Sequence, residues 1–267
     1  MKRELGVVKA ADSADWLLSR GIASATTSDL AQMLGVDEDQ VRRRLHSRVS
    51  RGEWVMPVRG LWIPIPPEYR TWGAPEGIEI IDVMMRHLGA SYYVGWLSAA
   101  QVHGASHHAP QVFQVAVDKQ VRNRIVGRTR FEFAQRDVDT IPVELRPTRS
   151  GSVRVSTAAV TCLDLASDVA RGGGIDNIAT VLIELSDEGH LDVSELSALS
   201  TRFPAAAGRR VGYVLDRYTG RTDLEELRAV VRNATLTPSR LDPTRDAAGA
   251  IDWNWQVYVN RELEPDS

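Results

Sequence analysis

The residues of this chain best suited to contact a charged partner lie in one short segment, DEDQVRRRLHSRVSRGEW, residues 37–54. The segment carries five arginines and one histidine, whereas the whole chain has a formal net charge of -3. A guanidinium group pairs bidentately with guanine or with phosphate oxygens, and a glutamine amide pairs in the same way with adenine. Positive charge focused on one segment is typical of a nucleic-acid contact, although it can also be a solvated surface face.

A helix is expected to present these side chains. At about 100° per residue, Val41, Leu45 and Val49 fall on one narrow face, which we predict to be buried. Polar side chains, His46 among them, point away from this face or flank it, where base edges and phosphates could be reached. The candidate DNA contacts on this helix are Gln40, Arg42, Arg43, Arg44, Ser47 and Arg48.

Two further helices are predicted before this one. ADSADWLLSRG indicates a short helix, and TTSDLAQMLGV indicates a second, with Thr27 or Ser28 as its cap and Gly35 at its end. The acidic residues 37–39 then suit the positive end of the arginine-rich helix. Two helices joined by a short turn containing glycine form a helix-turn-helix arrangement.

A hairpin is predicted directly after the arginine-rich helix. Residues 54–56 and 61–63 are β-rich, and the dipeptide Arg59-Gly60 separates them as a turn. Such a wing places Arg59 near its tip, where it is a further candidate DNA contact. The prolines after the hairpin indicate a linker, so we predict a winged helix-turn-helix domain at 1–68. Small winged helices also serve as protein docking modules, so that alternative stays open.

The remaining residues, 69–267, mix predicted helices and strands without a regular alternation. The chain is therefore expected to be α+β, with a larger mixed α/β domain after the winged helix. The tail, IDWNWQVYVN, alternates as a strand would. A second stretch, KQVRNRIVGRTR, has no acidic residue. Our hypothesis is that it extends the DNA contact or meets another partner. Its basic residues are Lys119, Arg122, Arg124, Arg128 and Arg130.

The sequence offers little for catalysis or metal binding. His103, His107 and His108 lie close together, but no carboxylate or cysteine nearby completes a metal site. Asp118 precedes Lys119 directly, which is the wrong spacing for a metal-dependent nuclease, and Cys162 lies in an apolar stretch that favours burial. We therefore expect no enzyme, no metal and no cofactor.

The chain is also expected to work in the cytoplasm. No apolar run approaches the roughly 20 residues that a membrane helix needs, and the N-terminus lacks the apolar region of a secretory signal. With one cysteine, an intrachain disulfide is impossible.

The order of several motifs along the chain resembles the AbiEi-type antitoxins, which are transcriptional regulators of bacterial abortive-infection toxin–antitoxin pairs. The motifs are RGLWIP, WLSAAQVHG followed by a Val-rich strand, VRVSTAAVTCLDLA, RRVGYVLD and the terminal WQVYVN. Each motif is degenerate alone, and their order is more specific.

The resemblance implies a repressor whose winged helix binds inverted repeats in its own promoter, so that two copies occupy one operator. It also implies a cognate nucleotidyltransferase-like toxin, counteracted by the C-terminal domain without a stable complex. It points to no catalytic residues, and the DNA contacts it implies are those of the helix and the wing. Two alternatives stay open: a winged helix that delivers a nucleic-acid-processing domain, and a protein-interaction module whose DNA binding is incidental.

Overall fold

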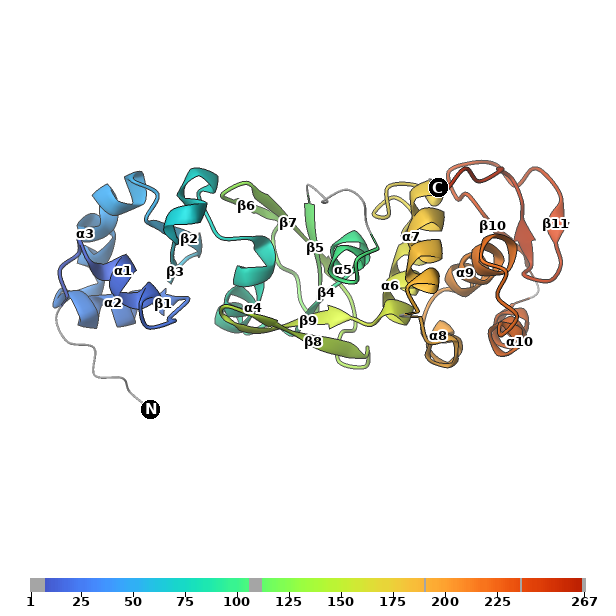
Figure 1. Ribbon diagram of the computed structural model, residues 1–267, viewed down its shortest axis with the longest axis horizontal. Helices are drawn as coiled ribbons and strands as arrows, with labels where there is room; N and C mark the ends of the chain where they lie inside the picture. The colour runs from blue at the N-terminus through green and yellow to red at the C-terminus, as the bar shows by residue number, and fades with distance from the viewer. Residues whose placement is uncertain (1–7, 106–111, 190, 236, 266–267) are drawn as a thin grey trace. The chain divides into compact units, whose positions relative to one another are not determined.

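The computed structural model describes residues 8–105, 112–189, 191–235 and 237–265 of the chain (Figure 1). Helices and strands are interspersed along it, so the predicted α+β class is confirmed. Contacts divide the chain into two compact units. The first holds Met1–Tyr93, Gln111–Asp139 and Leu145–Arg154, and the second holds Val94–Pro110, Thr140–Glu144 and Val155–Ser267. The predicted domain boundary at residue 68 falls inside the first unit and stays a prediction.

The first unit begins with three helices and a small sheet. In the sheet, β3 lies between β1 and β2, and it pairs antiparallel with both. The two strands of the β2–β3 hairpin are joined by Arg59 and Gly60, as predicted. The elements in order are α1 (Ser13–Leu18), β1 (Ala25–Thr26), α2 (Thr27–Leu34), α3 (Glu38–Ser50), β2 (Trp54–Val58) and β3 (Leu61–Pro64).

Both ends of α2 are fixed by local interactions. The cap at its start is Thr26, one residue before the predicted Thr27 or Ser28, because Thr26 and Asp29 form a reciprocal capping box. Gly35 ends the helix with φ 64°, a left-handed conformation that glycine adopts without steric cost. The chain then enters α3 after only two further residues, Val36 and Asp37.

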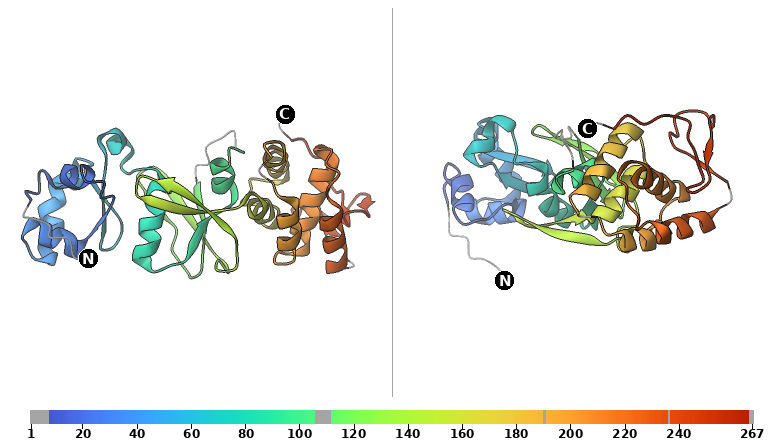
Figure 2. Two further views of the ribbon diagram at one scale, coloured as in Figure 1. Left: turned by 60° about the horizontal axis from the view of Figure 1, so that its bottom comes forward. Right: turned by 45° about the vertical axis from the view of Figure 1, so that its right-hand side comes forward.

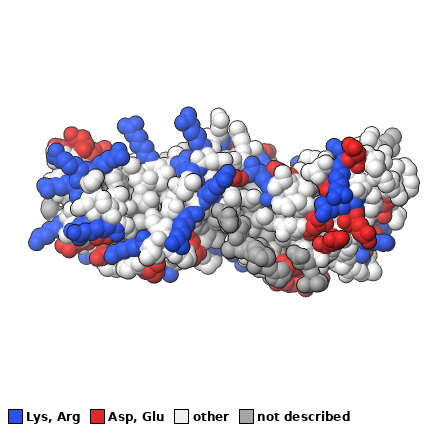
Figure 3. Space-filling view, turned by 90° about the horizontal axis from the view of Figure 1, so that it is seen from above, with Lys and Arg blue, Asp and Glu red and all other residues white. Residues whose placement is uncertain are grey.

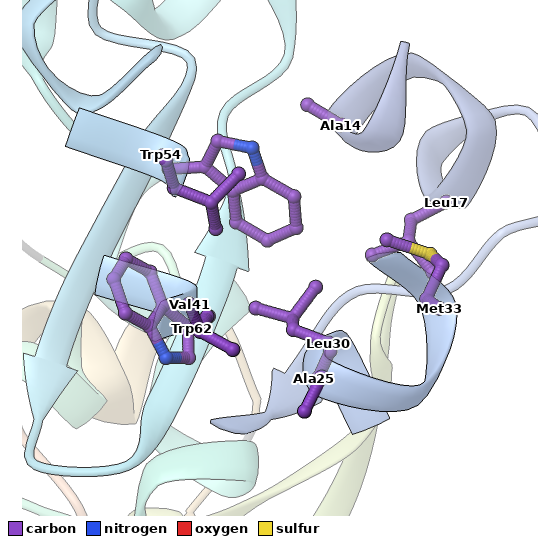
Figure 4. Close-up of a cluster of buried hydrophobic side chains, with 10 residues drawn as sticks. Ala14, Leu17, Ala25, Leu30, Met33, Val41, Trp54 and Trp62 are labelled. Atoms are coloured by element: carbon purple, nitrogen blue, oxygen red, sulfur yellow. The ribbon is translucent and has the colours of Figure 1, made fainter. Parts of the chain in front are cut away.

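One hydrophobic cluster holds these elements together (Figure 4). Leu30 and Met33 of α2 and Val41 and Leu45 of α3 are fully buried in it. Trp54 and Trp62 close it from β2 and β3, with their rings edge to face at a centroid distance of 6.4 Å. Because both helices bury side chains in the same cluster, the turn between them is held firmly.

The rest of the first unit contains a short 3-10 helix, an α-helix and strands of a six-stranded sheet. The sheet order is β6-β7-β5-β4-β9-β8, with β5 and β7 parallel and β6 and β7 joined as a hairpin. The division between the two units falls inside β4, β8 and β9. The elements are η1 (Pro67–Trp72), α4 (Gly77–Leu88), β4 (Tyr92–Val94), β5 (Val112–Val117), β6 (Arg124–Val126), β7 (Thr129–Gln135), β8 (Val143–Thr148) and β9 (Gly151–Ser156).

The second unit is mainly helical. Its α9 contacts α6, α7, α8 and α10, and the yellow and orange helices of Figure 2 show this bundle. Among the described residues, no helix combines the length and apolar character needed to cross a membrane. The helices are α5 (Trp96–Val102), α6 (Ala158–Ser167), α7 (Ile175–Asp187), α8 (Val193–Ser200), α9 (Ala205–Tyr218) and α10 (Glu225–Ala234).

The predicted terminal strand is wrong. Residues 253–256 form a turn, and the chain makes a small sheet of β10 (Ser239–Arg240), β12 (Val257–Tyr258) and β11 (Ile251–Asp252) in that order. Trp255 leaves the strand pattern because its ring packs against Gly212 of α9, where a Cβ atom would lie 2.0 Å from it. The indole Nε1 also donates to Asp216 Oδ2 at 2.7 Å. Tertiary packing therefore overrides the alternation.

Candidate nucleic-acid interface

Three consecutive arginines of α3 are presented to solvent. Arg42, Arg43 and Arg44 are exposed, and none has a hydrogen-bond or ion-pair partner among the described residues. Val41 and Leu45, opposite Arg43 on the helix, are fully buried. Since the buried side chains fix the rotation of α3, Arg43 points directly away from the cluster, and Arg42 and Arg44 project on either side of it. They can therefore pair with phosphate oxygens or base edges without first breaking an internal contact.

The other predicted contacts of α3 are less free. Arg48 forms an ion pair with Glu53 at 3.3 Å, with side-chain exposures of 22% and 13%. The Gln40 amide Nε2 donates to Asp37 Oδ2 at 3.4 Å, and Ser47 is exposed. Arg48 thus joins the end of α3 to the segment that leads into β2. Its predicted DNA contact would compete with this ion pair.

Val49 was predicted to be buried, and this prediction is wrong: 42% of its surface is exposed. The helical spacing is right, but α3 runs beyond the edge of the hydrophobic cluster in its last turn. The cluster contains Val41 and Leu45 and no residue further along α3. Periodicity gives the direction of a side chain, whereas burial also needs another element opposite it.

The β2–β3 hairpin, which is the predicted wing, lies against the start of α2 and the end of α4. The Thr27 amide donates to the Gly60 carbonyl at 2.9 Å, and a His87 ring nitrogen hydrogen-bonds to the Arg59 carbonyl oxygen at 3.0 Å. The side chain of Arg59 remains exposed, without a partner among the residues described. Gly60 has φ 86°, the conformation that a tight hairpin turn requires. Arg59 is therefore presented from a turn whose backbone is hydrogen-bonded to both α2 and α4.

In the second basic stretch, residues 119–130, some basic side chains contact other parts of the chain and others do not. Lys119 Nζ donates to the carbonyls of Leu88 and Gly89 at 2.8 and 2.6 Å, so it caps the end of α4. The Arg124 guanidinium donates to the Pro57 carbonyl at 3.3 Å, and burial lowers the pKa of this side chain. Three of the five predicted residues, Lys119, Arg124 and Arg130, therefore have contacts within the chain; for Arg130 the partner is Glu132 at 2.9 Å.

Arg122, just before β6, and Arg128, in the turn between β6 and β7, remain available for a partner. Both are exposed, and Arg128 lies over the Trp72 ring, 5.9 Å from its centroid. Figure 3 shows many Lys and Arg side chains projecting from the part of the molecule that holds the N-terminal elements. The basic surface therefore includes cations outside α3 and the wing.

The histidines and the cysteine considered for metal binding or catalysis do not form such a site among the described residues. His103 is buried, and its Nε2 hydrogen-bonds to the Ser156 carbonyl at 2.8 Å, whereas His107 and His108 lie outside the described residues. In the part of the chain that the structure describes, no group of three or more His, Cys, Asp or Glu could hold a metal ion. Cys162 is fully buried, which raises the pKa of its thiol well above the usual range.

Two arginines are buried, which the sequence does not predict. Arg209 and Arg210 of α9 are 0% and 6% exposed. Arg209 donates to the carbonyls of Thr235 and Thr237, and Arg210 Nη1 donates to the Ala166 carbonyl at 2.7 Å. Burial lowers the pKa of Arg210 to about 10. Arginine in an amphipathic helix is normally exposed, so only the positions of the carbonyl groups around it could have identified this pair.

Comparison with known proteins adds a direct observation. Residues 93–217 match the family model described as the AbiEi antitoxin C-terminal domain. This stretch is an AbiEi antitoxin domain. The resemblance to AbiEi-type antitoxins is thereby confirmed for these residues, and the chain carries the domain of the antitoxin in a toxin–antitoxin pair. The AbiEi domain begins inside β4 and ends in the last turn of α9, so α3 and the wing lie outside the match.

A solved structure resembles nearly the whole chain. The crystal structure of the RV2827C protein from Mycobacterium tuberculosis aligns with a TM-score of 0.67 and 19% sequence identity. The alignment covers 94% of this chain and 92% of that one, so the likeness includes the elements before the AbiEi domain. At this identity it establishes the fold alone. No curated protein matches the chain.

Proposed function

We propose that the chain is a transcriptional repressor of its own toxin–antitoxin operon as well as the antitoxin. The observation that carries the DNA-binding part is the row of exposed, unpartnered arginines, Arg42 to Arg44, on the helix after a helix-turn-helix connection. The element order α1–β1–α2–α3–β2–β3 supports the interpretation as a winged helix. The AbiEi domain supports the antitoxin part.

In this proposal α3 is the recognition helix. Arg43 lies on the side of α3 opposite Val41 and Leu45, at about 160–200° from each, so it reaches furthest into a major groove. Arg42 and Arg44 flank it, where phosphates of the two strands would lie. Arg59 on the wing contacts the neighbouring backbone, and Gln40 and Ser47 add polar contacts on the same helix.

The operator is proposed to be an inverted repeat bound by two copies of the chain, with half-sites about 34 Å apart when they are one helical turn apart. The toxin is proposed to be a nucleotidyltransferase-like protein that the AbiEi domain counteracts without a stable complex. The proposal contains no catalytic step by this chain, and it places the chain in the cytoplasm with its DNA.

The test is a DNA-affinity titration of the double variant Arg43→Ala/Arg44→Ala on the promoter sequence. A bidentate base contact from Arg43 contributes about 1–3 kcal/mol, and the variant also removes the phosphate contact of Arg44, so affinity should fall at least tenfold. The salt slope should fall by about 0.9 for each phosphate contact removed.

The matched control is Arg217→Ala/Arg232→Ala, which removes two exposed arginines from the second unit. The control removes the same amount of charge, but from residues outside the proposed DNA contacts. It should therefore change affinity less than threefold. Equal losses in the two double variants would mean that net charge alone governs binding, and the assignment of α3 would be wrong.

A further inference from the structure

An apolar pocket of about 320 Å³ opens on the first unit. One part of its wall comes from the proposed DNA-binding elements, at Leu18, Ile22 and Ile63. The other part comes from the segment after β3, at Pro67, Pro75 and Ile80. The volume lies at the small end of the range for ligand pockets, about 300–1,000 Å³, and an apolar wall with a few polar groups is typical of them.

Two groups of opposite charge lie on the same side of this pocket. Glu79 of α4 accepts the backbone N–H of Arg149 through Oε2 at 2.9 Å, and Ser150 Oγ donates to the Glu79 carbonyl at 2.6 Å. These bonds hold the turn between β8 and β9 on α4, and both Glu79 and Arg149 line the pocket. The second carboxylate oxygen of Glu79 has no partner among the described residues.

The Arg149 guanidinium is also accessible to a ligand. Its Nη1 donates to Glu68 Oε1 at 2.9 Å, but both side chains are more than half exposed. Exposed ion pairs contribute little to stability, so a carboxylate held in the pocket could replace Glu68. Arg149 also lies over the Tyr69 ring, 5.5 Å from its centroid, which holds the guanidinium at the rim.

We propose that the pocket binds a free α-amino acid with an apolar side chain. The side chain would fill the apolar interior, the ammonium group would pair with Glu79, and the carboxylate would pair with Arg149. A neutral apolar molecule would pair with neither Glu79 nor Arg149, and a simple amine or acid would pair with only one of them. A zwitterion is the ligand class that uses both.

Occupancy of this pocket has a consequence for DNA binding, which rests on the proposed function. A ligand in this pocket contacts the α1–β1 connection and the end of β3 together with α4 and the β8–β9 turn. It therefore stabilises one arrangement of the DNA-binding elements on the remainder of the first unit. The amino acid would act as an effector that changes operator affinity.

The test is calorimetric titration of the full chain with L-leucine and L-phenylalanine. Isopentylamine and 4-methylpentanoate serve as comparison compounds, because each lacks one of the two charges of leucine. We expect saturable binding of at least one amino acid and at least tenfold weaker binding of both comparison compounds. Absence of saturable amino-acid binding, or equal binding of the comparison compounds, would overturn the proposal.

Three variants locate the binding. Glu79→Gln keeps an acceptor for the Arg149 N–H but removes the charge, and Ala23→Phe fills the pocket from a half-buried loop position. Both should weaken binding at least tenfold with unchanged circular dichroism, whereas the exposed control Glu226→Gln should not. Unchanged binding in both pocket variants would place the ligand elsewhere and overturn the proposal.

The binding titration needs no DNA, so failure of the proposed repressor function would leave its result intact. In a separate titration, saturating amino acid should change operator affinity at least threefold in the wild-type chain and not in Ala23→Phe. An unchanged affinity in the wild type would refute the effector role, while the site itself would still be judged by calorimetry.

Discussion

Single side chains in α3 have two different roles, although they are of the same residue type. Arg42, Arg43 and Arg44 are free and exposed, whereas Arg48 is paired with Glu53 in a partly buried position. An arginine-rich sequence alone does not separate these roles. The position of Glu53 separates them, because this residue lies after the end of α3, where the chain turns back towards the helix.

Arg48→Ala is therefore expected to affect stability more than DNA binding. Losing the ion pair leaves Glu53 largely buried without its partner, at a cost of about 1–2 kcal/mol in the free energy of unfolding. DNA affinity should fall less than threefold, against at least tenfold for the Arg43→Ala/Arg44→Ala variant. Urea unfolding and DNA titration of the same preparation would measure both. A DNA-affinity loss in Arg48→Ala as large as in the double variant would contradict this division of roles.

The contact between Gly212 and Trp255 gives a second prediction at the scale of residues. A methyl group at Gly212 would overlap the Trp255 ring, so Gly212→Ala should destabilise the chain by about 1–3 kcal/mol. Thermal unfolding of Gly212→Ala, Trp255→Leu and the double variant would measure the coupling. The smaller leucine should relieve most of the overlap. Strictly additive effects would show that the two residues do not touch.

At the scale of elements, the position of α2 depends on its caps. Thr26 and Asp29 exchange hydrogen bonds at 3.1 Å (Asp29 N to Thr26 Oγ1) and 2.8 Å (Thr26 N to Asp29 Oδ2). The same residue, Thr26, ends β1, so the cap also fixes where the strand stops. The orientation of α3 depends on α2 through their shared hydrophobic cluster.

Thr26→Ala should cost about 1 kcal/mol of stability, the usual value for a lost N-cap. Thr26→Ser retains the hydroxyl group and should cost much less. Urea unfolding compares the two variants, and a serine variant as unstable as the alanine variant would assign the loss to the methyl group instead of the cap.

Sequence patterns located these elements where local interactions decide. Gly35 ends α2 as predicted, and the hairpin turn at Arg59 and Gly60 is where the β-rich residues place it. The sequence patterns gave wrong predictions where contacts between residues far apart in the sequence determine the structure. The tail bends because Trp255 packs on α9, and Arg209 is buried because backbone carbonyl groups surround it. The free and paired cations of the second basic stretch were also indistinguishable from sequence, because Lys119 and Arg124 bond to carbonyl groups far along the chain.

At the scale of the whole molecule, the proposed repressor and antitoxin roles use different residues. The AbiEi match covers residues 93–217, and the arginines of α3 lie outside it. Arg43→Ala/Arg44→Ala should therefore release the promoter yet still protect cells that express the cognate toxin. A reporter fused to the promoter and a growth assay with the toxin measure the two roles separately. Loss of protection in this variant at unchanged protein level would show that the roles share a surface.

The proposed repressor function depends on sequence-specific DNA binding through α3. The most direct measurement is a gel-shift titration on the DNA just upstream of the coding region of this chain, at two salt concentrations, with random DNA as competitor. We expect tight binding that resists the competitor and weakens with salt according to the number of phosphate contacts. Weak binding that random DNA abolishes equally would mean that the arginines of α3 give electrostatic attraction only, and would contradict the account.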